Sequence, residues 1–143
     1  MLINYTNIEQ YILTELDPLK TTHGVKTLEI YSGQLENEFS EIISLFPAVY
    51  VVCSNADFEP KNMMDITNAT IEIMCCDRDI RLTGEARQGA HGLVLGVREL
   101  LNRNNLSKTG VLFIKRERLI FWHPINRIAV MGANYEFKTM NYK

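Results

Sequence analysis

The sequence predicts one α+β domain in which a mixed, mainly antiparallel sheet is packed by about three helices. An amphipathic segment ends at Pro47 and leads directly into the almost wholly apolar run 48–53. Alternating apolar and polar residues follow it, which is typical of half-buried antiparallel strands. The chain has 143 residues, enough for one core and too few for two ordinary domains, so residues 1–143 are expected to form a single unit.

The first helix and the first strand are predicted from their periodicity. Apolar residues recur at helical spacing over 8–19, and Pro18 marks the end of the regular helix. A turn-forming stretch follows, and 25–31 then alternates as a strand does, which places Leu28 and Ile30 inward.

A second helix and a central strand are expected next. Residues 35–46 carry an apolar stripe opposite acidic side chains, which predicts a helix that ends at Pro47. The run 48–53 contains almost no polar residue, so it predicts a strand that is covered on both faces. Ser, Asn, Asp and Pro then make up much of 54–62, which predicts a loop that carries an exposed Phe58.

The alternation over 66–76 predicts a half-buried strand with Ala69, Ile71, Ile73 and Cys75 on one face. A third helix is expected over 89–101. Its three glycines each cost roughly 1 kcal/mol relative to alanine in a helix interior, so their presence predicts close packing against the sheet.

The C-terminal part predicts a polar loop and further strands. The loop covers 102–110, and 111–119 followed by 120–122 predicts a pair of strands that reaches Pro124. A long closing strand is expected from Ile128, with a bulge at Gly132 and Ala133 that shifts its register.

Composition and charge exclude several classes of function. The formal net charge of −2 argues against nucleic-acid binding through a broad basic face. The first residues lack a signal-peptide pattern, and no apolar run approaches the roughly 20 residues that span a bilayer, so a cytoplasmic protein is expected.

The sequence contains no pattern of residues that predicts catalysis, a cofactor or a metal. Cys53, Cys75 and Cys76 are expected to be buried free thiols, because adjacent residues on a strand point to opposite faces and cannot ligate one ion together. The candidate phosphate loop at 84–89 lacks the lysine and the hydroxyl that such a loop requires. We therefore expect a protein that is not an enzyme.

Two groups of residues are candidates for contact with a partner. Lys115, Arg116 and Arg118 place three cations within four positions, which fits either phosphate contact or an exposed hairpin whose charges discourage edge pairing. Trp122 fits either an aromatic contact or a core anchor at the end of the sheet, and the core anchor is favoured because large aromatic side chains are mostly buried.

Several segments, in order, resemble one known family. These are Tyr31-Ser32-Gly33-Gln34-Leu35, a helix leading into Phe46-Pro47-Ala48-Val49, the helix 89–101 and the closing stretch 135–139. The chain resembles the Mu gp37-like family of tailed-phage and prophage proteins over nearly its whole length. Residues 111–124 depart from the pattern, because a shorter link is expected before the last strand.

The resemblance implies a tail terminator or tail completion protein, which caps the tail tube as a ring, ends tail polymerisation and prepares head joining. The implied partners are other copies of the chain in a ring of probable sixfold symmetry, the tail tube, the sheath where the tail has one, and a head-completion or connector protein. No cofactor, membrane or direct nucleic-acid contact is implied. The implied place is the virion tail, assembled in the cytoplasm of the host bacterium.

On this interpretation the candidate contacts lie at sheet edges and in the loops 54–62 and 102–110. They are Phe58, Lys115, Arg116, Arg118 and Trp122. The alternatives are a minor tail or baseplate component and a small phage-encoded accessory protein that binds nucleic acid.

Overall fold

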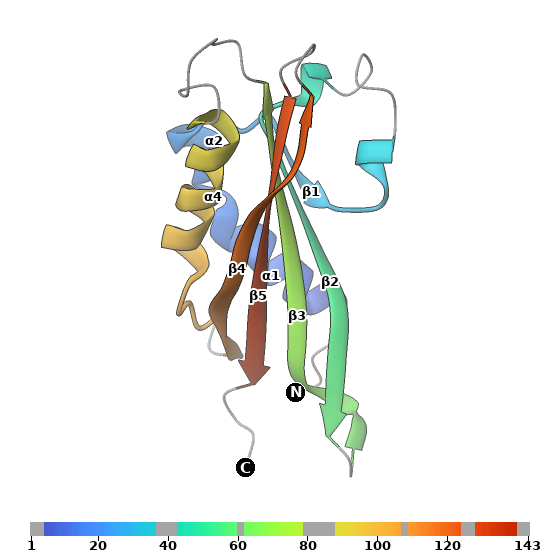
Figure 1. The fold of residues 1–143 in the computed structure, drawn as a ribbon. Coiled ribbons are helices and arrows are strands. Elements are labelled where there is room, and N and C mark those ends of the chain that lie inside the picture. The colour runs from blue at the N-terminus through green and yellow to red at the C-terminus, as the bar shows by residue number, and fades with distance from the viewer. Residues whose placement is uncertain are drawn as a thin grey trace.

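Five strands form one sheet in the order β1-β2-β3-β5-β4, as the computed structural model shows (Figure 1). The structure describes residues 5–36, 43–59, 62–78, 88–106, 109–123 and 128–139. The strands are β1 (Thr27–Ile30), β2 (Ala48–Glu59), β3 (Asn62–Arg78), β4 (Gly110–His123) and β5 (Ile128–Thr139). β1 runs parallel to β2 and the other three pairings are antiparallel, which confirms the predicted mixed, mainly antiparallel sheet.

Three α-helices pack on one face of the sheet, which we call the helix-covered face (Figure 1). They are α1 (Tyr5–Leu16), α2 (Leu19–Thr22) and α4 (Gln88–Leu101). The helix predicted over 35–46 lies partly outside the described residues. Its described ends are short 3₁₀ helices, η1 (Gln34–Glu36) and η2 (Ile43–Leu45).

The main core lies between these helices and the sheet. Every second residue of β3 enters it, because successive side chains on a strand alternate between the two faces. The apolar stripes of α1 and α4 cover these side chains. The main contributors from β3 are Ala69, Ile71, Ile73 and Cys75, as the alternation predicts.

A second, smaller cluster lies on the opposite face of the sheet, which we call the open face. It contains Phe46, Ala48, Tyr50, Cys76, Ile128 and Val130. The start of β2 is therefore covered on both faces, which confirms the interpretation of the apolar run 48–53. β2 is nevertheless the second strand of the sheet, and β3 is the middle one.

The loop predicted over 54–62 is wrong, because β2 continues to Glu59 and β3 begins at Asn62. Register shifts between Cys53 and Asn55 and again near Phe58 interrupt the pairing of β2 with β3. The polar composition reflects an exposed sheet face interrupted by bulges rather than a loop.

The strand pair predicted over 111–122 is also wrong, because β4 is one continuous strand. Its pairing with β5 shifts twice and leaves Lys115 and Ile120 without register partners, whereas β5 pairs with β3 in continuous register through Gly132. The bulges therefore lie on β4 and not at Gly132–Ala133. Gly132 leaves space for Ile120, whose Cδ1 would lie 2.5 Å from a Cβ atom at position 132.

Two of the three α4 glycines sit against a neighbour, but only Gly89 faces the sheet as predicted, at Asp77 on β3, whereas Gly96 faces Leu19 and His23. A Cβ atom at Gly96 would lie 2.8 Å from Cε1 of His23, and one at Gly89 would overlap the Asp77 carboxylate. Gly92 faces open space, so close packing does not explain its presence in the helix.

Candidate assembly surfaces

β4 forms one edge of the sheet, and no described strand pairs with its outer side (Figure 1). Near the start of β4 the segment after α4 occupies this outer side, because the Arg103 N–H donates to the Leu112 carbonyl oxygen at 2.7 Å and the Leu112 N–H donates to that of Asn104 at 3.0 Å. Farther along an edge strand, unpaired backbone N–H and C=O groups are a ready template for contact with another chain. β4 also carries most of the large exposed apolar side chains of the described residues. These are Phe113, Leu119, Ile120, Phe121 and Trp122.

Four of the five predicted contact residues lie on β4. The register places Arg116 opposite Asn134 and Arg118 opposite Gly132, both on the open face. Lys115 lies at a bulge, with its Nζ 3.5 Å from Oε2 of Glu136. The structure therefore gathers the three cations on the exposed edge strand of the antiparallel pair β4–β5, which agrees with the exposed-hairpin alternative.

Trp122 lies opposite Ala129 and is 37% exposed, so the favoured core-anchor interpretation is wrong. The physical reason is its position on an edge strand, where no neighbouring strand shields the outer side of the indole. The aromatic-contact interpretation fits this exposure.

Glu117 fixes β4 to the helix layer from the helix-covered side. Its Oε2 accepts a hydrogen bond from Nε of Arg98 on α4 at 2.8 Å, and its Oε1 pairs with the Nη2 atom of the same guanidinium. The hydrogen bond and the charge of Glu117 raise the pKa of Arg98. Such two-point contacts are geometrically specific, so the edge strand is held in a defined position.

Phe58 lies on the other side of the sheet, on β2, with β3 and β5 between it and β4. It is 39% exposed, so the predicted exposure is confirmed although the predicted loop is not. β1 pairs only with Ala48–Val51, and no described strand pairs with the outer side of the remainder of β2, whose inner side pairs with β3. The Cys53 N–H beyond this pairing donates instead to Oε2 of Glu9 at 2.9 Å.

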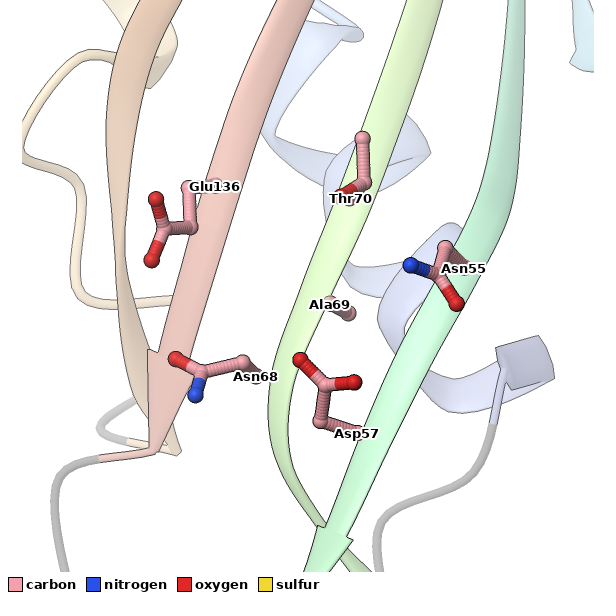
Figure 2. A pocket seen from close by; sticks show the side chains of 6 residues that line it. All are labelled: Asn55, Asp57, Asn68, Ala69, Thr70 and Glu136. Atoms are coloured by element: carbon pink, nitrogen blue, oxygen red, sulfur yellow. The ribbon is translucent and has the colours of Figure 1, made fainter.

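The open face contains a polar hollow of about 250 Å³ between β2 and β5 (Figure 2). Asn55 and Asp57 extend from β2 over β3, whereas the Glu136 carboxylate turns away toward β4 (Figure 2). That carboxylate lies 3.5 Å from the Nζ atoms of both Lys115 and Lys138. Among the described residues, no group of three or more His, Cys, Asp or Glu side chains is placed to hold a metal ion.

The three thiols are buried and unpaired, as predicted. Burial raises the pKa of Cys53 to about 11 and that of Cys76 to about 12, and it raises the pKa of Cys75 well above its ordinary value. All three are therefore protonated at neutral pH, in which form a thiol is a poor nucleophile and a poor metal ligand.

No helix in the described ranges combines the length and the apolar character that a membrane crossing needs.

Sequence reasoning missed the exposure of Phe113, Leu119 and Ile120. One signal was available, because apolar residues occupy positions of both parities in 111–122. A strand with one buried face needs apolar residues only at every second position. Additional apolar residues at the positions between them indicate either a second covered face or an exposed contact surface.

Comparisons with known proteins agree with this architecture. A family model described as Bacteriophage Mu, Gp37 matches residues 4–121. A chain from the virion of a native gene transfer agent particle has the same fold, with a TM-score of 0.56 and 12% sequence identity over 92% of this chain and 93% of that one. No curated protein matches the sequence. Because the family model covers most of the chain, the family resemblance noted from the sequence is confirmed over residues 4–121, and the chain belongs to the Bacteriophage Mu Gp37 family of phage proteins.

Proposed function

We propose that this chain is a structural protein of a phage-like virion, and specifically a tail terminator that caps the tail tube as a ring. The family match over residues 4–121 is the observation that carries the proposal. The shared fold with a chain of a gene transfer agent virion supports it over nearly the full length.

The arrangement of the sheet supports a ring. A ring that closes head to tail needs two different surfaces on each copy. The β4 edge is one exposed surface, and the edge formed by β1 and the remainder of β2 is the other. Phe58 lies on β2 beside the second edge and Trp122 on the first, so each edge has a partly exposed aromatic side chain near it. Such side chains often dominate the energetics of an interface.

In this proposal the partners are further copies in a sixfold ring, the tail tube, the sheath where the tail has one, and a head-completion or connector protein. The protein is assembled in the cytoplasm of the host bacterium and resides in the virion tail. Its role is geometric and requires no cofactor.

Deletion of the gene, followed by electron microscopy of the particles, tests the proposal. We expect overlength tails without heads, and normal tails when the gene is supplied from a plasmid. Tails of normal length joined to heads would exclude a terminator. Tails of normal length with a defective tip would indicate the minor tail or baseplate alternative.

One observation favours a second candidate function, since Lys115, Arg116 and Arg118 gather on one edge strand. An accessory protein that used them to bind DNA would lose affinity steeply with added salt, because phosphate contacts release counterions. Titration of a labelled duplex at two salt concentrations separates the candidates, and we expect no salt-dependent binding.

A further inference from the structure

We propose that the β4 edge of one copy contacts the β1 edge of the next, with Arg116 and Arg118 facing an acidic patch formed by Glu29 and Glu36. The inference rests on the proposed ring and names the surfaces that close it. The occupant of each edge is a second copy of this chain.

Opposite charges end the same row of the sheet. The register pairings connect five open-face positions from one edge to the other. They are Arg118, Gly132, Met74, Tyr50 and Glu29. If a second copy lies beside this one without a shift along the strand direction, Arg118 of one copy therefore lies next to Glu29 of the other.

The name acidic patch refers to two exposed carboxylates, Glu29 on β1 and Glu36 in the turn that follows it. Gln34, two residues before Glu36, donates from Nε2 to Oε2 of Glu29 at 3.2 Å and to the carbonyl oxygen of Ile30 at 2.9 Å. These bonds hold the turn against the end of β1. Lys26, also exposed, lies one residue before the strand and is the described cation nearest to the patch in sequence.

The cations of β4 are available for such a contact. Arg116 and Arg118 are exposed, and neither forms an ion pair with another described residue. The side chains of Phe113 and Phe121 are exposed on the same face of the strand, which supplies apolar surface beside the charges. Aromatic and arginine side chains together are typical of the centre of a protein interface.

The charges also disfavour the competing arrangement. Pairing of two β4 edges about a twofold axis would bring arginines of both copies together, and like charges across an interface cost several kcal/mol. A contact between different edges avoids this repulsion. Across the sheet β1, β2 and β5 run in one direction, and β3 and β4 run in the other. When the next copy has the same orientation, β4 therefore lies antiparallel to the β1 strand of that copy. Repetition of this contact generates a ring when the rotation between neighbouring copies closes on itself.

Charge reversal tests the contact in the full chain. One variant carries Arg116→Glu and Arg118→Glu, and a second carries Glu29→Lys and Glu36→Lys. In native mass spectrometry we expect each variant alone to appear as a folded monomer of about 16.5 kDa. The protein concentration at which half of the chains are in rings should rise at least tenfold. A mixture of the two restores complementary edges, so we expect alternating rings with equal numbers of each variant.

The control reverses two cations away from both edges, Lys20→Glu on α2 and Arg78→Glu at the end of the middle strand β3, and changes the net charge as much as the first variant does. We expect it to form rings as the unmodified chain does. Rings formed by each edge variant alone, or failure of the mixture to recover rings from two folded variants, would overturn the inference and leave the proposed function standing. A failure of the unmodified chain to form rings would overturn the inference, and the particle phenotype of the gene deletion would decide the terminator role separately.

Discussion

The guanidinium of Arg98 and the carboxylate of Glu117 connect the helix layer to the edge strand. The Nε–Oε2 distance is 2.8 Å, and a second hydrogen bond joins the other oxygen to the same guanidinium. The Glu117 side chain is only 15% exposed, so its charge is partly removed from water beside this partner. The pair therefore fixes the position of β4 relative to α4, with the outer side of the strand facing away from the sheet.

Removal of either partner is expected to destabilise the fold, and the two losses are expected not to add. Arg98→Ala leaves the mostly buried Glu117 carboxylate without its donor, so the double variant Arg98→Ala, Glu117→Ala should lose less stability than the sum of the single variants. Urea denaturation of all four chains in the cycle measures the coupling. Additive losses would show that the pair makes no direct contribution.

Glycine substitutions are expected to have opposite effects at two positions. A Cβ atom at Gly110 would lie 2.3 Å from Cζ of the buried Phe137 and 2.6 Å from the carbonyl oxygen of Lys138, and the backbone cannot move aside. Gly110→Ala should therefore cost about 1–3 kcal/mol. Gly92→Ala, which meets nothing within 4 Å in a helix, should stabilise by up to about 1 kcal/mol. The free energies of unfolding measure both effects, and a destabilising Gly92→Ala would contradict the prediction.

Glu9 is expected to stabilise β2 just beyond the residues that pair with β1. Its carboxylate is buried and accepts the Cys53 N–H at 2.9 Å. Glu9→Ala removes the acceptor from a buried donor, which should cost about 1–3 kcal/mol. Glu9→Gln keeps an oxygen at the same position and is expected to cost less. Equal losses for the two variants would assign the effect to packing instead.

Tyr50 is expected to make the protein sensitive to alkali. Burial raises the pKa of its hydroxyl to about 12, against about 10 for an ordinary tyrosine. Above pH 10 the unfolded chain releases this proton and the folded chain keeps it, so the free energy of unfolding falls as the pH rises, by up to about 1.4 kcal/mol per pH unit for this group.

Tyr50→Phe removes this group and should reduce the loss of stability between pH 10 and 12. At pH 7 we expect no loss, because the Tyr50 hydroxyl has no hydrogen-bond partner among the described residues. Tyr5→Phe, at an exposed position, is the control and should leave the alkaline profile unchanged. An unchanged profile for Tyr50→Phe would show that other groups cause the loss.

Phe58→Ala is expected to weaken assembly and leave the monomer folded, because the ring is partly exposed on β2. The melting temperature should stay close to that of the parent, while the concentration needed for ring formation rises. Ile71→Ala in the core is the contrasting variant and should cost about 2–5 kcal/mol of stability. A Phe58→Ala chain that fails to fold would refute the prediction.

Much of the fold followed from local periodicity. The apolar stripe over 8–19 predicted α1, and the spacing over 89–101 predicted α4 almost to its ends. The alternation over 66–76 identified the core-facing side chains of β3, because a strand with one buried face repeats every two residues. The double coverage of the start of β2 could be predicted from its lack of polar residues.

The candidate surfaces were only partly predictable. Phe58 and the cations of β4 were identified from their composition, but the sequence placed Phe58 in a loop and did not show that it and the cations lie on opposite sides of one sheet. Bulges at Lys115 and Ile120 interrupt the period of β4, so its alternation resembles that of two short strands. Local patterns do not report a bulge that depends on the partner strand.

By itself the sequence determined α1, α4, the core-facing alternation of β3 and the apolar start of β2, because these properties depend on neighbours along the chain. Only the tertiary structure decided that β4 lies at an edge, that Trp122 is exposed there, and that Arg118 and Glu29 end the same row on opposite sides of the sheet. Strand order and register arise from pairing between residues far apart in sequence. An edge strand is exposed because no further strand pairs with its outer side, and local sequence does not reveal this.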